Sequence, residues 1–172
     1  MRDPSPPRTP WVSEAIVVKD SAIAGRGLFA NQDLTEGAVV IRVGGTLVGT
    51  EELRALIETS DHYVDTLTVF EDVHLVLPAA TTVHYGNHSC DPNLWHVGPY
   101  EIATRRPVRA GEELTIDYAT QTGASGFSLP CRCGTADCRG EVTSEDWRRA
   151  DLQARYAGHW VPALAARVAR PT

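Results

Sequence analysis

Residues 85–93, Tyr-Gly-Asn-His-Ser-Cys-Asp-Pro-Asn, and residues 131–138, Cys-Arg-Cys-Gly-Thr-Ala-Asp-Cys, decide the fold of this chain. These two stretches contain all four of its cysteines. A structural zinc ion takes four ligands in a tetrahedron, and thiolates suit it well. If Cys90 is the fourth ligand, a metal joins the C-terminal segment to the Asn-His loop and brings the two together at one site.

The spacing Cys-x-Cys-x4-Cys lets neighbouring thiolates face one cation in a tight turn, for which Gly134 supplies the freedom. Free structural cysteines are usually scattered among apolar residues. The two cysteines of a Cys-x-Cys stretch are also too close in the sequence to form a disulfide easily. We therefore expect Zn²⁺ at this site, with either Cys90 or water as the fourth ligand. A closed four-cysteine site is structural, so no metal chemistry is expected. The ligands predicted are Cys90, Cys131, Cys133 and Cys138.

The bulk properties indicate one globular domain. The chain has 172 residues, of which 42% are hydrophobic and 22% charged, enough for one core. Its net charge of −6 disfavours direct binding to nucleic acid. It suits a basic protein partner, although a small negative charge is also ordinary for solubility. Without an apolar run for a membrane span or a signal peptide, we expect a cytoplasmic protein; monomer or dimer stays open.

Short apolar segments between turn residues predict a mainly β fold with α additions. A helix is expected over residues 51–58 with Thr50 as its cap, and two more over 147–156 and 160–168. The expected strands are 15–18, 25–30, 38–43, 46–48, a hairpin over 66–77 that turns near 71–72, and then 102–104 and 114–116.

Taken singly, the polar motifs are ambiguous. Asn87-His88-Ser89 matches a glycosylation acceptor, which the absence of a secretory signal disfavours. A Ser89 or Cys90 nucleophile lacks the surrounding elbow motif. Gly25-Arg26-Gly27 is an ordinary turn or a backbone laid against a ligand, and Tyr118 alone would be a packing residue.

In their order along the chain, these motifs resemble one family. Residues 25–30 (Gly-Arg-Gly-Leu-Phe-Ala), 87–93, 112–118 (Glu-Glu-Leu-Thr-Ile-Asp-Tyr) and 131–140 are similar to the SET-domain protein lysine methyltransferases with a post-SET zinc segment. The resemblance runs from about residue 15 to residue 140. It implies small curved sheets with a C-terminal pseudoknot, an exception to the usual unknotted chain. The expected organisation is a flexible arm (1–10), a SET domain (11–120), a post-SET segment (121–140) and a helical extension (141–172).

The resemblance implies an enzyme that transfers a methyl group from S-adenosylmethionine to a lysine of a basic protein or peptide. Tyr118 would be catalytic, and the amine would enter from the face opposite the cofactor. The residues implied for the cofactor are Gly25, Arg26, Gly27, Asn87, His88, Tyr118, Leu129 and the segment at Cys131.

The substrate side departs from the family pattern. Ile116 stands where the family often has Phe or Tyr, which favours the addition of more than one methyl group. A second channel tyrosine is missing near residues 42–45, and Tyr63 or Tyr85 is expected to replace it. No strong base is evident. Two alternatives stay open: a SET-like binding module without turnover, and a zinc-stabilised interaction domain.

Overall fold

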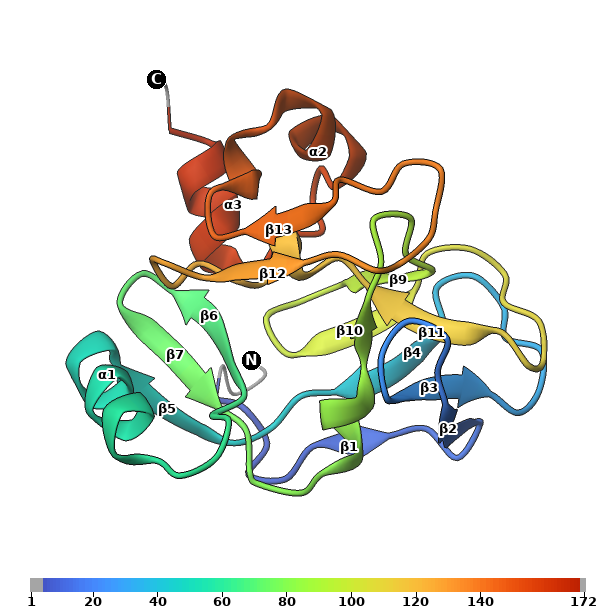
Figure 1. Cartoon of the computed structure of the whole chain (residues 1–172), viewed down its shortest axis with the longest axis horizontal. Coiled ribbons are helices and arrows are strands. Elements are labelled where there is room, and N and C mark those ends of the chain that lie inside the picture. Colours follow the sequence, from blue (N-terminus) through green and yellow to red (C-terminus); the bar gives the residue numbers. More distant parts are fainter. Residues whose placement is uncertain (1–4, 171–172) are drawn as a thin grey trace.

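The fold is built from small sheets rather than one large one. The computed structural model describes residues 5–170, and Figure 1 shows its sheets side by side below a helical C-terminal part. The first sheet has the order β1 (Trp11–Val12), β4 (Val39–Arg42), β10 (Glu101–Thr104) and β9 (Leu94–His96), all antiparallel.

The second sheet brings together segments that lie far apart in the sequence. Its order is β2 (Ile16–Asp20), β3 (Arg26–Ala30), β11 (Glu113–Ile116) and β8 (Asn87–His88), and β8 pairs parallel to β11. The third sheet contains β5 (Thr46–Gly49), β7 (Val73–Val76) and β6 (Thr66–Phe70), while β12 (Ser128–Pro130) pairs with β13 (Glu141–Thr143).

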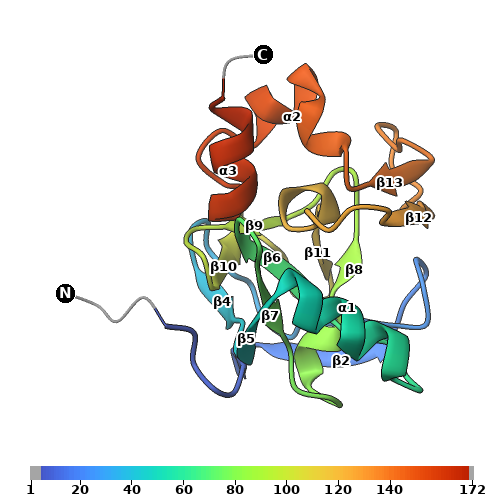
Figure 2. The same cartoon turned by 90° about the vertical axis from the view of Figure 1, so that its left-hand side faces the viewer.

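The helices are short and lie at the edges. They are α1 (Thr50–Thr59), α2 (Ala150–Arg155) and α3 (Pro162–Val168), with 3-10 turns η1 (Thr82–Tyr85), η2 (Tyr118–Thr120) and η3 (Asp146–Arg148). Figures 1 and 2 both place α2 and α3 together on one side of the sheets, apart from α1. Between residues 5 and 170, no helix is long and apolar enough to cross a bilayer.

Two apolar clusters meet at Tyr118. The larger fills the space between the sheets and includes the fully buried Leu28 and Leu114. The smaller is formed by the C-terminal part and includes Tyr156, which is also fully buried. Tyr118 packs against both clusters. Burial of apolar side chains is the main favourable contribution to folding, so the two clusters fix the segment that carries this tyrosine from both sides.

The predicted strands and the hairpin are confirmed. Two helix predictions need correction. Thr50 does not cap α1, whose first helical residue it is; its hydroxyl bonds Asp72 and His74 instead. The helix expected over 147–156 is broken at Arg149, whose backbone is extended between η3 and α2.

The N-terminal arm is attached to the fold where it is described. The N–H of Gly45 donates to the carbonyl of Pro7 at 2.9 Å. A side chain at Gly44 would lie 2.6 Å from that same carbonyl oxygen. Residues 1–4 of the predicted arm lie outside the described residues.

Candidate active site

The parallel pairing of β8 with β11 places the Asn-His motif beside Tyr118. His88 lies opposite Ile116 in the ladder, and Tyr118 follows two residues later. The backbone N–H of Tyr118 donates to Nδ1 of His88 at 3.2 Å. Its hydroxyl donates to the carbonyl of Gly86 at 2.6 Å. Tyr118 is therefore bonded at both its backbone and its hydroxyl to the segment that carries the motif.

His88 is held as a neutral imidazole. Its Nδ1 accepts from Tyr118, so Nε2 carries the hydrogen and donates to Sγ of Cys90 at 3.3 Å; this tautomer is assigned from the hydrogen bonds. Burial lowers the pKa of His88 to about 4, although the nearby Asp117 carboxylate opposes the shift. Both ring nitrogens thus have partners within the protein, and only the backbone of His88 is left for a cofactor.

Asn87 fixes the glycine-rich turn. Its amide donates to the carbonyls of Ala24 (3.2 Å) and Arg26 (3.1 Å) and to Glu113 (2.8 Å). A Cβ on Gly27 would overlap the carboxylate of Glu113. Glycine is required here because the two segments approach so closely. The side chain of Asn87 therefore holds the turn, whereas the sequence suggested that it binds a cofactor directly.

The four cysteines converge. Their sulfur atoms all lie within 4.8 Å of one another, and the Sγ atoms of Cys90 and Cys131 are 3.7 Å apart. Zn–S bonds of about 2.3 Å in a tetrahedron separate sulfurs by about 3.8 Å, so the donor set fits a zinc ion. Cys90 is fully buried, and its sulfur also accepts the N–H of Arg139 at 3.4 Å. The structure thus brings Cys90 to the fourth position.

A buried ion pair joins the cysteine segment to the residue before Tyr118. The two terminal nitrogens of Arg139 each lie 2.8 Å from an oxygen of Asp117. Asp117 is fully buried and also accepts from the hydroxyl of Tyr156 at 2.9 Å. The sequence analysis did not find these residues. Arg139 follows Cys138 in the sequence, and Asp117 precedes Tyr118. These positions alone did not show that Arg139 and Asp117 meet in the fold.

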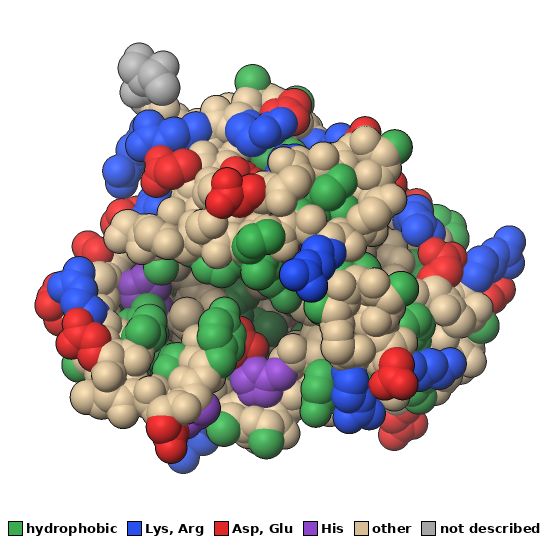
Figure 3. Space-filling model, viewed as in Figure 1, with side chains coloured by type: hydrophobic (Ala, Val, Ile, Leu, Met, Phe, Trp, Pro, Cys, Tyr) green, Lys and Arg blue, Asp and Glu red, His purple; other side chains and the backbone are tan. Residues whose placement is uncertain are grey.

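On its other side, Tyr118 lines a cavity of about 490 Å³. Figure 3 shows this hollow with hydrophobic side chains inside it and histidine at its edge. Burial raises the pKa of Tyr118, and the charge of Asp65 raises it further, so the phenol stays protonated at neutral pH. The lining side chains include Leu28, Ile41, Tyr63, Asp65, Leu77, His84, Ile102, Leu114, Ile116, Thr122 and Phe127.

The residues predicted for the channel separate into two groups. Ile116 and Tyr63 line the cavity, Tyr63 at its mouth with 78% of its surface exposed. Tyr85 does not line it, because its ring packs under the guanidinium of Arg26 at 5.0 Å on the side of the glycine-rich turn. Leu129 is half-buried in β12.

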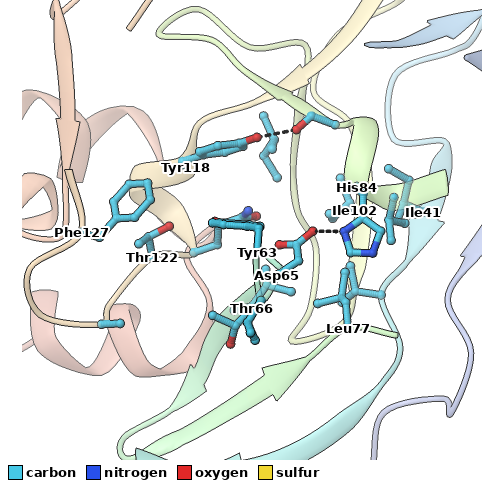
Figure 4. A pocket seen from close by; sticks show the side chains of 18 of the residues that line it. Ile41, Tyr63, Asp65, Thr66, Leu77, His84, Ile102, Tyr118, Thr122 and Phe127 are labelled. Carbon is cyan, nitrogen blue, oxygen red and sulfur yellow. Dashed lines mark hydrogen bonds and ion pairs between the residues drawn. The ribbon is translucent and has the colours of Figure 1, made fainter. Parts of the chain in front are cut away.

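The sequence shows no evident base, and the structure adds two titratable side chains to the cavity wall. Asp65 and His84 line the cavity, and Nδ1 of His84 lies 2.6 Å from Oδ2 of Asp65 (Figure 4). Burial raises the pKa of Asp65, against the opposing effect of His84. No sequence signal pointed to this pair, because the two residues are 19 positions apart, with Asp65 in the loop before β6 and His84 in η1.

Comparison with known proteins agrees with this geometry. The SET-domain family profile matches residues 25–119, more than half of the chain. This chain belongs to the SET-domain family. The match covers the glycine-rich turn, the Asn-His motif and Tyr118, while the cysteine segment follows it.

Two curated relatives are longer proteins that are named as histone-lysine N-methyltransferases. Histone-lysine N-methyltransferase 2B of Homo sapiens is 34% identical over 145 residues, which cover 73% of this chain and 5% of the relative. The H3 lysine-36 specific histone-lysine N-methyltransferase of Debaryomyces hansenii is 28% identical over 136 residues, which cover 72% of this chain and 18% of the relative. The chain thus spans only a small part of either.

Solved structures share the SET fold. The methyltransferase domain of human histone-lysine N-methyltransferase SETMAR superposes with a TM-score of 0.60 at 18% identity, covering 73% of this chain and 56% of that one. At this identity the likeness concerns the fold alone.

Proposed function

We propose that this protein is an S-adenosylmethionine-dependent protein lysine methyltransferase. The observation that carries the proposal is the hydrogen bond from Tyr118 to the Gly86 carbonyl. It fixes a protonated phenol at a cavity wall, directly beside the Asn87-His88 strand. With the hydroxyl hydrogen donated to Gly86, the phenol oxygen is free to accept a hydrogen bond from an amine in the cavity.

The cavity favours the reactive form of a lysine. Free lysine has a pKa near 10.4, and the ammonium form is disfavoured among apolar side chains such as Leu28, Ile102 and Leu114. Hydrogen bonding to Tyr118 aligns the nitrogen lone pair, so most of the acceleration comes from positioning.

The cofactor would lie against the Asn-His strand and the glycine-rich turn. The two segments are adjacent because Asn87 donates to the carbonyl of Arg26, and Gly27 leaves room for the Glu113 carboxylate that Asn87 also bonds. Leu129, on β12 next to the cysteine segment, would cover the adenine. When bound, S-adenosylmethionine supplies an electrophilic methyl group on a sulfonium.

Zinc would have a structural role. The four sulfurs fit its tetrahedron, and metal binding supplies folding free energy to a segment with little core of its own. Through Cys90 it would hold the end of the Asn-His loop, and through Cys131 it would hold the strand that carries Leu129.

The substrate side accepts an exposed lysine on a basic protein or peptide. The cavity opens between residues 62–66 and residues 122–127, and the net charge of −6 attracts a basic partner. The curated relatives are named for histone lysine methylation, which makes histone tails a suitable first probe. Because Ile116 offers no hydroxyl to restrict the amine, we expect more than one methyl group per lysine.

The test combines binding with transfer. Zinc-loaded protein is titrated calorimetrically with S-adenosylmethionine, and methyl transfer from labelled cofactor to core histones and polylysine is followed. The Tyr118→Phe variant should keep its cofactor affinity and lose about 100-fold or more in transfer. Cofactor binding without transfer to either substrate would support a binding module, and no cofactor binding at all would leave a zinc-stabilised interaction domain.

A further inference from the structure

Asp65 and His84 form a hydrogen-bonded acid–imidazole pair in the wall of the cavity. Their side chains are 27% and 24% exposed, so both reach the cavity surface. Figure 4 shows them pointing toward each other, on the far side of Tyr63 from Tyr118. Tyr63 and Tyr118 line the same cavity as Asp65; burial raises the pKa of both tyrosines, and the charge of Asp65 raises it further.

The two hydrogen bonds of His84 fix the proton count of the pair. Its Nε2 lies 2.8 Å from the carbonyl of Pro78, which only accepts, so Nε2 carries a hydrogen. Its Nδ1 lies 2.6 Å from Oδ2 of Asp65. Because a carboxylate oxygen and a bare ring nitrogen both carry lone pairs, they approach this closely only with a proton between them. The pair therefore holds one shared proton and is neutral overall, either as carboxylate with imidazolium or as acid with imidazole.

Asp65 is the only carboxylate among the described residues that line the cavity, and no lysine or arginine lines it. The other titratable groups that face the pair are His62, Tyr63 and Tyr118. An ammonium group in an apolar space is costly unless it is paired, and a hydrogen bond between charged partners is about twice as strong as a neutral one. The cavity thus offers an ammonium group one carboxylate, and that carboxylate shares a proton with His84.

We propose that Asp65, supported by His84, binds the incoming lysine ammonium and accepts the proton that the amine must lose. This inference rests on the proposed methyl transfer and adds a catalytic residue to it. Asp65 would be catalytic because it touches the reacting amine, and His84 would be a positioning residue that acts through Asp65.

Protons and charge are conserved in the proposed transfer. The ammonium donates to the oxygen of Asp65 that does not face His84. As a proton moves from the ammonium to that oxygen, one proton leaves the pair to solvent, so a proton stays between Asp65 and His84 and the amine keeps a lone pair. The lone pair forms the new C–N bond while the C–S bond breaks and its electrons pass to sulfur. The methylated nitrogen carries the positive charge, and the pair again holds one proton.

The first experiment needs neither cofactor nor protein substrate. n-Butylammonium, which resembles the end of a lysine side chain, is titrated into the zinc-loaded protein, and chemical shifts of the tyrosine rings are followed by NMR. We expect Asp65→Asn to weaken butylammonium binding at least tenfold. The matched control is Asp61→Asn, which removes the same charge from an exposed Asp61–His62 pair on the same loop and should bind like the wild type.

A second arm uses the wild type alone, in case Asp65→Asn does not fold. Butylammonium should bind more tightly than 1-butanol, which has the same length and no charge. Equal binding of the two probes, or equal butylammonium affinity in Asp65→Asn and Asp61→Asn, would overturn the proposal.

The third arm is the pH dependence of methyl transfer to core histones. In Asp65→Asn the amine must lose its proton unaided, so transfer should fall about 100-fold at pH 7 and rise about tenfold per pH unit toward the lysine pKa. The wild type and Asp61→Asn should reach their plateau at lower pH. Identical profiles in all three proteins would refute the role of Asp65, whereas absence of transfer in the wild type would count against the methyltransferase itself.

Discussion

Arg139 and Asp117 form a two-pronged ion pair that is closed to solvent, with side chains 5% and 0% exposed and both N–O distances 2.8 Å. Arg139 follows the last cysteine, and Asp117 precedes Tyr118. The pair is thus a direct link between the cysteine segment and the proposed catalytic residue.

Removing this arginine should destabilise the protein strongly. Arg139→Ala leaves the Asp117 carboxylate buried without its partner, and such a loss costs about 3–5 kcal/mol. The free energy of unfolding is measured by urea denaturation of the zinc-loaded protein. Arg132→Ala removes the same charge from an exposed position in the same segment and should cost under about 0.5 kcal/mol. Equal losses in the two variants would show that the buried pair has no special role.

Zinc should bind at one ion per chain and order the cysteine segment. Chelation is expected to lower the melting temperature, raise hydrogen exchange in residues 127–145 and weaken S-adenosylmethionine binding, because the metal supplies folding free energy there. Cys90→Ser removes the buried ligand and should reproduce these effects, with little further change on chelation. Unchanged exchange after complete metal removal would contradict the coupling.

Gly27 should not tolerate a side chain. In Gly27→Ala the new methyl group displaces the Glu113 carboxylate, which accepts hydrogen bonds from Ser21 and Asn87. We expect a loss of about 1–3 kcal/mol and weaker cofactor binding, since the displaced carboxylate no longer supports the hydrogen bonds that hold the turn. Gly98→Ala is the control, because a Cβ there meets open space. Calorimetric titration and thermal melting of both variants check the expectation.

The C-terminal extension should be part of the folding unit rather than an independent appendage. Trp160 is 7% exposed and packs edge-on against Tyr156, whose hydroxyl bonds Asp117. Trp160→Ala should cost about 3–5 kcal/mol and reduce methyl transfer through the altered Tyr118 segment. Trp11→Ala, at an exposed tryptophan with 42% accessibility, should cost much less. If Trp160→Ala keeps the stability and methyl transfer of the wild type, the C-terminal extension does not support the site.

Stability should fall in acid partly because of His96. Burial lowers the pKa of His96 to about 4, and its Nδ1 has no hydrogen-bond partner among the described residues. The unfolded chain therefore binds a proton between pH 6.5 and pH 4 that the folded protein does not. The His96 contribution is complete above pH 6.5, and about 3 kcal/mol of it is lost as the pH falls to 4.

The test compares two histidine variants. His96→Asn should make the dependence of unfolding free energy on pH less steep between 6.5 and 4 and leave the part that the buried His88 contributes, as measured by urea denaturation at several pH values. His62→Asn, at an exposed histidine, should leave the slope as in the wild type. If the slope persists in His96→Asn, the acid sensitivity comes from other groups.

Local patterns were sufficient for the longer strands and for the group of four cysteines. β-Branched runs between glycine-containing turns, such as residues 38–43, become strands because side-chain alternation and turn preference act over a few residues. The very short strands β1, β8, β9, β12 and β13 were missed, since two or three residues carry no periodicity and form only because a partner strand lies beside them. Thr50 was misassigned because a side chain that can cap a helix can equally bond to Asp72 across the fold.

The sequence by itself determined the family, the set of four cysteines and Tyr118, because these depend on residue type and close spacing. Tertiary structure decided which distant groups meet: Asp65 with His84, and Asp117 with both Arg139 and Tyr156. The physical reason is that hydrogen bonds and ion pairs act over about 3 Å, a distance that only the folded backbone sets between residues far apart in the chain.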